Sequence, residues 1–252
     1  MTYISNTDFR LEVARGNVSG SETWNKFGFN DDVDTGASEI IASFGGSYVV
    51  PTTAETLTIV STSAQDSEAP ATGCRSVVIT GIDANREKQV EVVALDGTAG
   101  VTTTSTWLGI NRVAPFLCGS SQSNVGTITI TNSTSGNTLA QMPAGLSVTQ
   151  QAILHVQSAH TFYAEWLWIN VRKLSGGTAP RVTIKGWVFS PVANANIEVF
   201  EARIDTAIEN TVELKPTEPF PITENSVLYF TAETNTNNTA VSMRFSGIEL
   251  PN

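Results

Sequence analysis

Apolar and β-branched residues recur in short runs from one end of the chain to the other, and Gly, Asn, Asp, Ser or Pro separate these runs. Within a run, apolar and polar positions tend to alternate, which is the pattern of a strand with one buried face. Helical periodicity is nearly absent. The pattern therefore predicts an all-β protein, with antiparallel strands in a sandwich or barrel and short connections between them.

The strand-like runs form two groups, separated at residues 142–150, where the sequence Met-Pro-Ala-Gly-Leu-Ser-Val-Thr-Gln interrupts the alternation. Pro and Gly in such a stretch favour a domain boundary. We therefore expect two antiparallel β-sandwich or jelly-roll-like domains, over residues 45–146 and 147–252. Runs in the first domain cover residues 57–61, 76–80, 89–95, 107–113 and 126–131. Runs in the second are longer and cover residues 152–157, 162–173, 181–189, 197–204, 211–214, 226–233 and 240–250.

Residues 1–44 have a different character, because glycines and an acidic turn break up a few aromatic residues. This composition predicts an N-terminal arm or lead-in that becomes ordered by packing on a neighbouring subunit. Its aromatic residues Trp24, Phe27 and Phe29 are therefore candidate interface residues.

The run over residues 162–169 is apolar on both faces near Trp166 and Trp168. A strand of this kind is buried on both sides, either within its own domain or against a partner subunit. We therefore add Trp166, Trp168 and Trp187 to the candidate interface. An alternative stays open, because aromatic rings also stack on sugar rings. Buried rings at Trp107 and Trp187 would argue against such a sugar-binding platform.

Charge narrows the range of partners. The chain has 252 residues, with 24 acidic and 14 basic side chains and a formal net charge of −10, and no Lys/Arg cluster interrupts the acidic average. A nucleic-acid partner is therefore not expected, because phosphate contacts need concentrated positive charge. No run of residues is long and apolar enough to span a membrane, and the N-terminus lacks the pattern of a secretory signal. We expect a protein made in a host cytoplasm, without a membrane partner.

Patterns of catalytic or metal-binding residues are missing. His155 and His160, the two histidines, are separated by an odd offset across a strand and a turn, which does not favour a joint metal site. No Gly-x-Ser-x-Gly motif occurs, and neither cysteine has a catalytic context. The sequence therefore predicts no catalytic residue, no cofactor, no metal ligand and no enzyme activity.

Three features keep alternatives open. The acidic turn Asp31–Asp34 does not have the spacing of an EF-hand loop, so a solvated turn is favoured, while cation binding stays open. The carboxylates of residues 198, 201 and 205 could imitate the acid pair of a glycosidase. Cys74 and Cys118 are interpreted as two buried thiols, and a disulfide between them stays open.

One ordered set of turns and strands supports a family resemblance. From Gly81 to Thr131 the chain has an Ile-Asp-Ala-Asn turn, a Val-rich strand, the segments Leu95–Val101 and Ile110–Val113, and the stretch Gly119–Ile130. This order resembles an uncharacterised family of virion structural proteins of marine and environmental tailed bacteriophages. Residues 152–170 are similar to the second half of that family.

The resemblance covers most of the chain from about residue 53 onward, and its motifs are turn and strand signatures. One departure is Gln157-Ser158-Ala159-His160, where the family usually has a Pro-Ala-Gly turn, so the local turn type differs. The family implies a component of a virus particle and no enzyme activity.

Together these observations predict a non-enzymatic virion protein, either a capsid decoration or stabilising subunit or a tail-associated one. Its partners would be other virion proteins and further copies of itself, with a trimer as one candidate assembly. The alternative is a receptor- or carbohydrate-binding module on the particle, with a host-surface glycan as its ligand.

Overall fold

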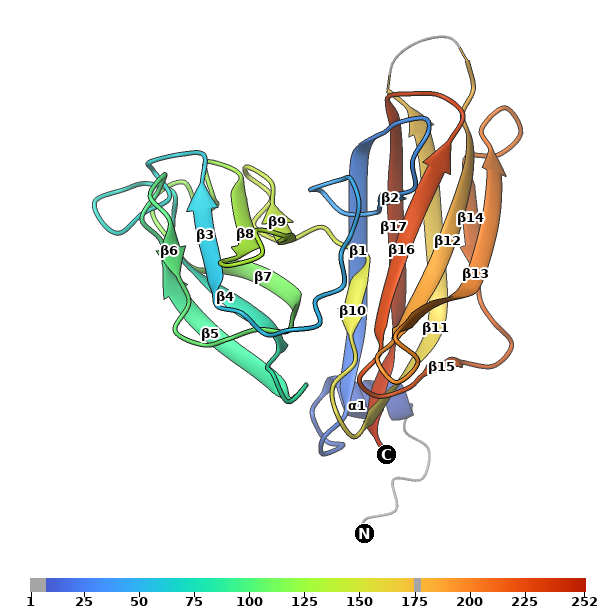
Figure 1. Ribbon diagram of the computed structural model, residues 1–252, viewed down its shortest axis with the longest axis horizontal. Helices are drawn as coiled ribbons and strands as arrows, with labels where there is room; N and C mark the ends of the chain where they lie inside the picture. Colours follow the sequence, from blue (N-terminus) through green and yellow to red (C-terminus); the bar gives the residue numbers. More distant parts are fainter. Residues whose placement is uncertain (1–7, 175–177) are drawn as a thin grey trace.

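The structure is a computed structural model that describes residues 8–174 and 178–252, and it is nearly all β. The expectation of an all-β protein is confirmed. One short helix, α1 (Phe9–Ala14), precedes the first strand of the described residues. The strands belong to two units, which lie side by side in Figure 1.

The larger unit, here called the sandwich unit, consists of two antiparallel sheets. The β17 sheet has the strand order β1-β17-β11-β14, and β15 also pairs with β11. The β16 sheet has the order β10-β16-β12-β13, and β2 also pairs with β16. The strands of this unit are β1 (Glu22–Val33), β2 (Glu39–Ile40), β10 (Ile153–His155), β11 (His160–Lys173), β12 (Arg181–Ser190), β13 (Ala195–Asp205), β14 (Thr211–Leu214), β15 (Phe220–Ile222), β16 (Val227–Thr234) and β17 (Thr239–Pro251).

The two sheets pack face to face around one hydrophobic core. Alternation along β17 points Val241, Met243 and Phe245 into this core, as the two-residue period of a strand requires. The ring of Phe245 lies 5.3 Å, centroid to centroid, from that of Phe230 on β16. Aromatic packing between the layers therefore joins the two sheets.

The smaller unit, here called the inserted unit, has its own core between a four-stranded sheet, β6-β3-β8-β9, and a three-stranded sheet, β5-β4-β7. Strict alternation in β8 buries Ile128 and Ile130 and leaves the threonines between them half-buried. The strands of this unit are β3 (Leu57–Ser61), β4 (Cys74–Ile82), β5 (Lys88–Ala94), β6 (Val101–Thr102), β7 (Gly109–Cys118), β8 (Ile128–Asn132) and β9 (Thr138–Met142).

The inserted unit interrupts a single strand position of the sandwich unit. Both β2 and β10 pair with β16, at successive positions along the same edge. The Ala152 N–H donates to the Ile41 carbonyl at 2.9 Å, and the Ser43 N–H donates to the Gln150 carbonyl, also at 2.9 Å. The chain therefore leaves the sheet after Ile41, forms the inserted unit and returns beside its point of exit.

A glycine allows this crossing. Gly28 of β1 faces the point where the chain leaves and returns, and a Cβ atom there would collide with the Ile41 carbonyl and the Ala152 backbone nitrogen. Both of those groups are backbone and cannot move away. The position therefore excludes larger residues for reasons of packing.

The structure corrects the prediction of an N-terminal arm. Residues 22–33 form β1, an edge strand paired with β17 from Glu22–Glu249 to Val33–Thr239, and residues 39–40 form β2. The interpretation was wrong for this segment because β17, the partner of β1, lies more than two hundred residues away in sequence. Residues 1–7 of the expected arm lie outside the described residues.

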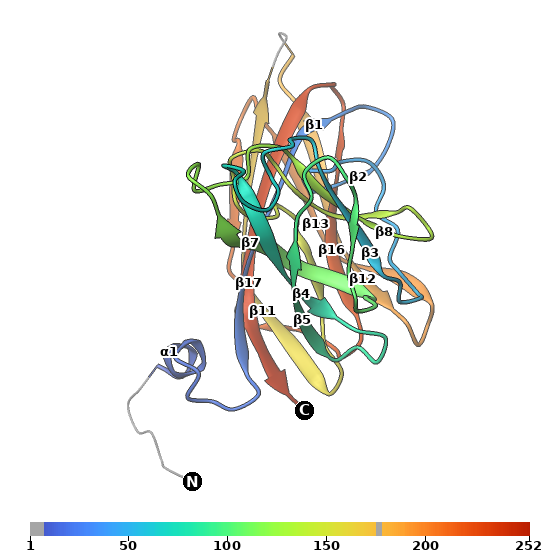
Figure 2. The same ribbon diagram turned by 90° about the vertical axis from the view of Figure 1, so that its left-hand side faces the viewer.

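The two units also contact each other beside the crossing. In Figure 1 the inserted unit lies to the left of the sandwich unit, and in Figure 2, turned by 90°, it lies in front. Strand β7 of the inserted unit packs against β10 of the sandwich unit. The described part of the chain contains no helix long and apolar enough to cross a membrane.

Because the chain returns beside its exit, we expect the sandwich unit to fold without the inserted unit. Replacing residues 44–149 with Asn-Gly would join Ser43 to Gln150 through a two-residue hairpin turn. We expect this variant to keep a cooperative unfolding transition and a β-type circular dichroism spectrum, at lower stability, because it loses the cover that residues 44–50 give to the outer face of the β16 sheet. A non-cooperative transition would show that the two units fold as one.

Candidate functional site

The outer face of the β17 sheet gathers aromatic and cationic side chains from three strands. Phe27 on β1, Arg244 on β17 and Trp168 on β11 are successive partners across the sheet. The strand neighbours of Arg244 and Trp168 point into the core, so these two side chains point outward. The neighbours of Phe27 point the other way, Lys26 to the Asn111 carbonyl and Gly28 to the crossing. Phe27 therefore lies on the same outer face, where its ring contacts Arg244. We call the outward set the aromatic face, and its members are Phe27, Phe29, Trp166, Trp168, Arg172 and Arg244.

A β-bulge in β11 brings both tryptophans to this face. The register shifts between Ala164 and Trp166, which leaves Glu165 as the extra residue. Before the bulge Ala164 points into the core, and after it Leu167 and Ile169 do. One extra residue reverses which side chains face outward. The apolar character of this strand on both faces, predicted from sequence, has this geometric cause.

Arginines cover part of the aromatic surface. The guanidinium carbon of Arg244 lies 5.3 Å from the centroid of the Phe27 ring, and that of Arg172 lies 5.9 Å from the Phe29 ring. These are cation–π distances. Such contacts hold the guanidinium groups over the rings.

Trp166 is held by a polar partner at the edge of the face. Its indole N–H donates to Glu213 Oε1 at 2.8 Å, and Lys215 lies 2.9 Å from the same oxygen. The hydrogen bonds from Lys215 and then from Trp166 lower the pKa of the Glu213 carboxyl. The tryptophan ring is therefore fixed in orientation before any partner binds.

A hollow of about 470 Å³ lies on the aromatic face, lined by Phe27, Trp166, Trp168, Ser242 and Arg244. Two indoles and a phenyl ring offer apolar walls, and a hydroxyl and a guanidinium offer polar contacts. This combination can bind an apolar side chain beside a carboxylate or carbonyl, or a sugar ring.

The structure brings together four of the six expected interface residues. The other two lie elsewhere. Trp24 packs against the sandwich core and donates from its indole to Glu249 at 2.6 Å. Trp187 lies on the outer face of the β16 sheet, where it packs against the cluster around Tyr229 and donates to Thr231 at 3.0 Å.

Sequence reasoning missed the arginines of the aromatic face. Ser242, Arg244 and Ser246 alternate with core residues along β17, so the alternation does indicate an outward-facing set. It does not indicate that Phe27 and Trp168 flank Arg244, because strand pairing between distant segments is not visible in the alternation. Trp107 is fully buried in the core of the inserted unit, which excludes it from the alternative of a sugar platform.

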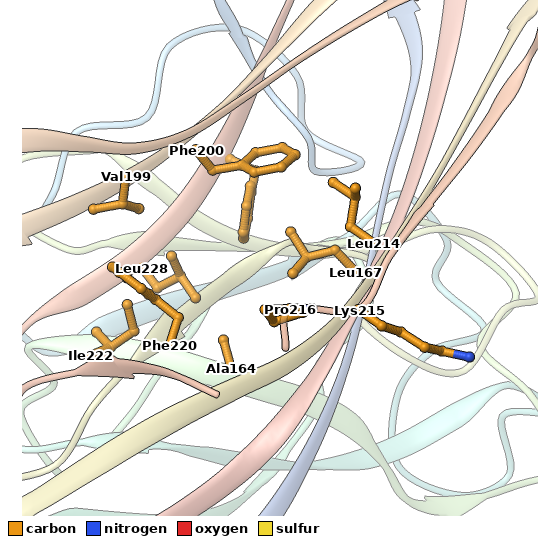
Figure 3. Close-up of a pocket in the computed structure, with 11 residues that line it drawn as sticks. Ala164, Leu167, Val199, Phe200, Leu214, Lys215, Pro216, Phe220, Ile222 and Leu228 are labelled. Carbon is orange, nitrogen blue, oxygen red and sulfur yellow. The ribbon is translucent and has the colours of Figure 1, made fainter. Parts of the chain in front are cut away.

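A second concave feature lies at the open edge of the sandwich, between β13 and the β14–β15 side (Figure 3). Its volume is about 320 Å³. Apolar side chains dominate the lining, and Lys215, its charged member, points its ammonium away from the pocket in Figure 3. The lining residues are Ala164, Leu167, Val199, Phe200, Leu214, Lys215, Pro216, Phe220, Ile222, Leu228 and Phe230.

The contact between the two units, here called the seam, contains buried polar groups. The Asn111 side chain donates to the His155 carbonyl at 3.0 Å and accepts from the His155 N–H at 2.7 Å. The Asn111 side chain thus satisfies the backbone N–H and carbonyl of His155 on β10, as a neighbouring strand would. The Lys26 ammonium donates to the Asn111 carbonyl, and the Tyr48 hydroxyl lies 3.0 Å from His155 Nε2.

Burial shifts the titration of both bases in the seam. Desolvation, and then the charge of Arg112, lowers the pKa of Lys26 to about 7. Desolvation, and then the charges of Lys26 and Arg86, lowers the pKa of His155 to about 3. His155 is therefore neutral at physiological pH and serves as a hydrogen-bonding group of the seam.

The remaining candidate residues do not converge on one site. The carboxylates of Glu198, Glu201 and Asp205 lie on the edge strand β13 and bind Lys185, Arg203 and Arg181, respectively. The His160 ring contacts the backbone carbonyls of residues 158 and 20, whereas His155 contacts Tyr48. Among residues 8–174 and 178–252 there is no group of three or more His, Cys, Asp or Glu side chains suited to a metal ion.

In the acidic turn, Asp31 and Asp32 are exposed. The Asp34 carboxylate accepts the Asn238 N–H at 3.2 Å and so fixes the neighbouring turn.

Comparison with known proteins finds no matching family model and no matching curated protein. Similar solved structures include one described as "Structure of infectious bursal disease virus Gt strain", with 9% identity over 92% of this chain and 72% of that chain, and a TM-score of 0.19. Another is a structure of T=1 particles derived from infectious bursal virus, with 9% identity over 92% of this chain and 79% of that chain, and a TM-score of 0.13. Scores of this size do not establish a common fold, so neither likeness bears on function.

The seam makes the stability of the protein depend on pH. Between pH 7 and 10 the unfolded chain holds a proton on Lys26 that the folded protein disfavours, so the free energy of unfolding rises with pH, by up to roughly 1.4 kcal/mol per pH unit. We expect Lys26→Met to remove this rise, measured by urea unfolding from pH 7 to 9.5. Lys88→Met, an exposed lysine that is also close to the seam, is the matched control. An unchanged slope in Lys26→Met would contradict this account.

Proposed function

We propose that this chain is a non-enzymatic structural subunit of a virus particle and that it binds neighbouring subunits through the aromatic face. The proposal rests on the scaffold, on the face itself and on the charge of the chain.

The scaffold has the strand order of a jelly roll. With β2 and β10 taken as one interrupted strand and β14 and β15 as another, eight strand positions follow each other along the chain. In that numbering one sheet has the order 1-8-3-6 and the other 2-7-4-5, and the pairs are antiparallel. Jelly rolls occur in viral capsid and lectin domains. In this numbering the inserted unit is a second β domain, which interrupts strand position two between β2 and β10.

The observation that carries the proposal is the row Phe27–Arg244–Trp168 on an outward sheet face. Aromatic residues and Arg are enriched in protein interfaces, and Trp and Arg dominate their binding energy. The rings are already half-buried, and that of Phe27 is held by a cation–π contact with Arg244. Little side-chain freedom is therefore lost when a partner covers them.

Charge favours a second copy of the same chain as the partner. The aromatic face carries the cations Arg172 and Arg244, while the chain as a whole has a net charge of −10. An acidic surface elsewhere on a neighbouring copy is therefore electrostatically complementary to this face. We propose a homo-oligomer, with a trimer as one candidate, located in the virion as a capsid decoration or tail-associated subunit of a tailed bacteriophage, as the family resemblance implies.

The hollow on the aromatic face supports a second candidate function, which is the binding of a host-surface glycan. Trp166 and Trp168 give flat walls for stacking on a sugar ring, and Ser242 and Arg244 give hydrogen-bonding groups beside them. Trp107 is buried, so a platform would consist of the tryptophans of this face.

For the assembly role, we expect Phe27→Ala to weaken self-association. Truncating a central aromatic residue of an interface costs about 2 kcal/mol, which corresponds to roughly thirty-fold weaker association. Sedimentation velocity over a range of protein concentrations measures this change. Phe116→Ala is the matched control, because Phe116 is 65% exposed on the inserted unit, away from the aromatic face.

Two outcomes would contradict the assembly role. One is a wild-type protein that sediments as a monomer at every concentration. The other is an equal loss of association in Phe27→Ala and Phe116→Ala. Thermal unfolding of each variant separates weakened association from loss of the fold.

For the glycan role, a sugar bound in the hollow should quench the tryptophan fluorescence of the protein, because it would stack on Trp166 and Trp168. We expect glycans selected on an array to bind wild-type protein, and Trp166→Ala to lose that binding while Trp187→Phe keeps it. Binding that survives in Trp166→Ala would place the glycan site elsewhere.

A further inference from the structure

Cys74 and Cys118 occupy facing positions on neighbouring strands of the inserted unit. Cys74 begins β4, Cys118 ends β7, and the two residues are partners in the antiparallel ladder. The Gly119 N–H donates to the Gly73 carbonyl at 2.7 Å, just outside the pair. That hydrogen bond identifies the cysteines as a non-hydrogen-bonded pair, in which the Cα atoms lie about 4.5 Å apart and the side chains approach each other.

This spacing suits a covalent bond. Disulfides join cysteines whose Cα atoms are roughly 4.4–6.8 Å apart, so the pair lies within the range without movement of the backbone. Burial, followed by the neighbouring Cys118 thiol, raises the pKa of the Cys74 thiol to about 12.

The strand end that carries Cys74 is fixed by a buried carboxylate. Asp66 Oδ1 accepts the N–H groups of Cys74 at 2.9 Å and Val125 at 2.8 Å, and Oδ2 accepts the N–H of Gly126 at 2.7 Å. On the other strand, a Cβ atom on Gly119 would collide with the backbone carbonyl of Thr72. Both backbones are held close together at this point, so the two Cβ atoms stay within reach of each other.

We propose that Cys74 and Cys118 form an intramolecular disulfide when the protein meets a small-molecule disulfide such as oxidised glutathione. This modification site goes beyond the assembly role and does not depend on it. In a reducing cytoplasm both residues stay thiols, as they are in the structure. Outside the cell the bond would cross-link two strands of the inserted unit.

The different exposure of the two residues sets the order of the steps. Cys118 is half-buried, whereas Cys74 is fully buried. The Cys118 thiolate attacks one sulfur of the small disulfide, forms a mixed disulfide and releases the first small thiolate. The Cys74 sulfur, after losing its proton to solvent, then attacks the Cys118 sulfur and releases the second small thiolate. Two protein thiols are oxidised and one small disulfide is reduced to two thiols.

The test uses the full-length protein, purified with a reductant and then equilibrated with oxidised and reduced glutathione. We expect intact-mass measurement to show the loss of two hydrogen atoms without a glutathione adduct, and peptide mapping to find Cys74 linked to Cys118. The bond closes a loop of roughly forty residues, so the Tm should rise by roughly 5 °C or more and fall again with dithiothreitol.

Single variants separate the proposed order from general thiol reactivity. We expect Cys74→Ser to retain a stable glutathione adduct on Cys118, because no second thiol is present to displace it. Cys118→Ser should stay unmodified and show no dithiothreitol-dependent Tm. Two free thiols, two glutathione adducts or an intermolecular disulfide in the wild-type protein would each overturn the proposal.

Discussion

The strand position shared by β2 and β10 is the constraint on which the rest of the structure depends. The sandwich needs one continuous edge beside β16, yet the chain leaves this edge after Ile41 and returns at Ala152. The two passages hydrogen-bond to each other, so the sheet loses almost no backbone pairing at the break. Gly28 is required on the facing sheet because any side chain there would occupy the space of the crossing. A complete second β unit is thereby accommodated without opening the first.

The seam follows from this arrangement. A unit that leaves and returns at one strand position must lie against the neighbouring strands, and here β7 packs on β10. Strand β10 is at the edge of its sheet, so the backbone groups on its outer side would lack a strand partner. The Asn111 side chain provides that partner, and Lys26 reaches the Asn111 carbonyl from β1. The contact is therefore polar and buried, which favours one fixed arrangement of the units and makes their packing sensitive to protonation.

A single extra residue in β11 determines the character of the outer face. Without the bulge at Glu165, the strand would direct Leu167 and Ile169 outward and the two tryptophans into the core. With it, aliphatic residues fill the sandwich and Trp166 and Trp168 lie beside Arg244. The same residue therefore sets the packing of the core on one side of the sheet and the composition of the aromatic face on the other. Bulges are frequent near functional surfaces for this reason.

The sequence by itself determined the β class and most strands, because alternation with a period of two is a local property. The run at 57–61 coincides with β3, and that at 211–214 with β14. Strands β1 and β2 escaped detection because glycine and acidic residues hide their pattern, and their partners lie far away in sequence. The sequence shows Cys74 and Cys118 as two thiols, but their facing positions in the sheet depend on the register of β4 against β7. The sequence likewise indicated aromatic residues as candidates for an interface, and only the tertiary structure decided which of them share a face, because strand order and register arise from contacts between distant segments.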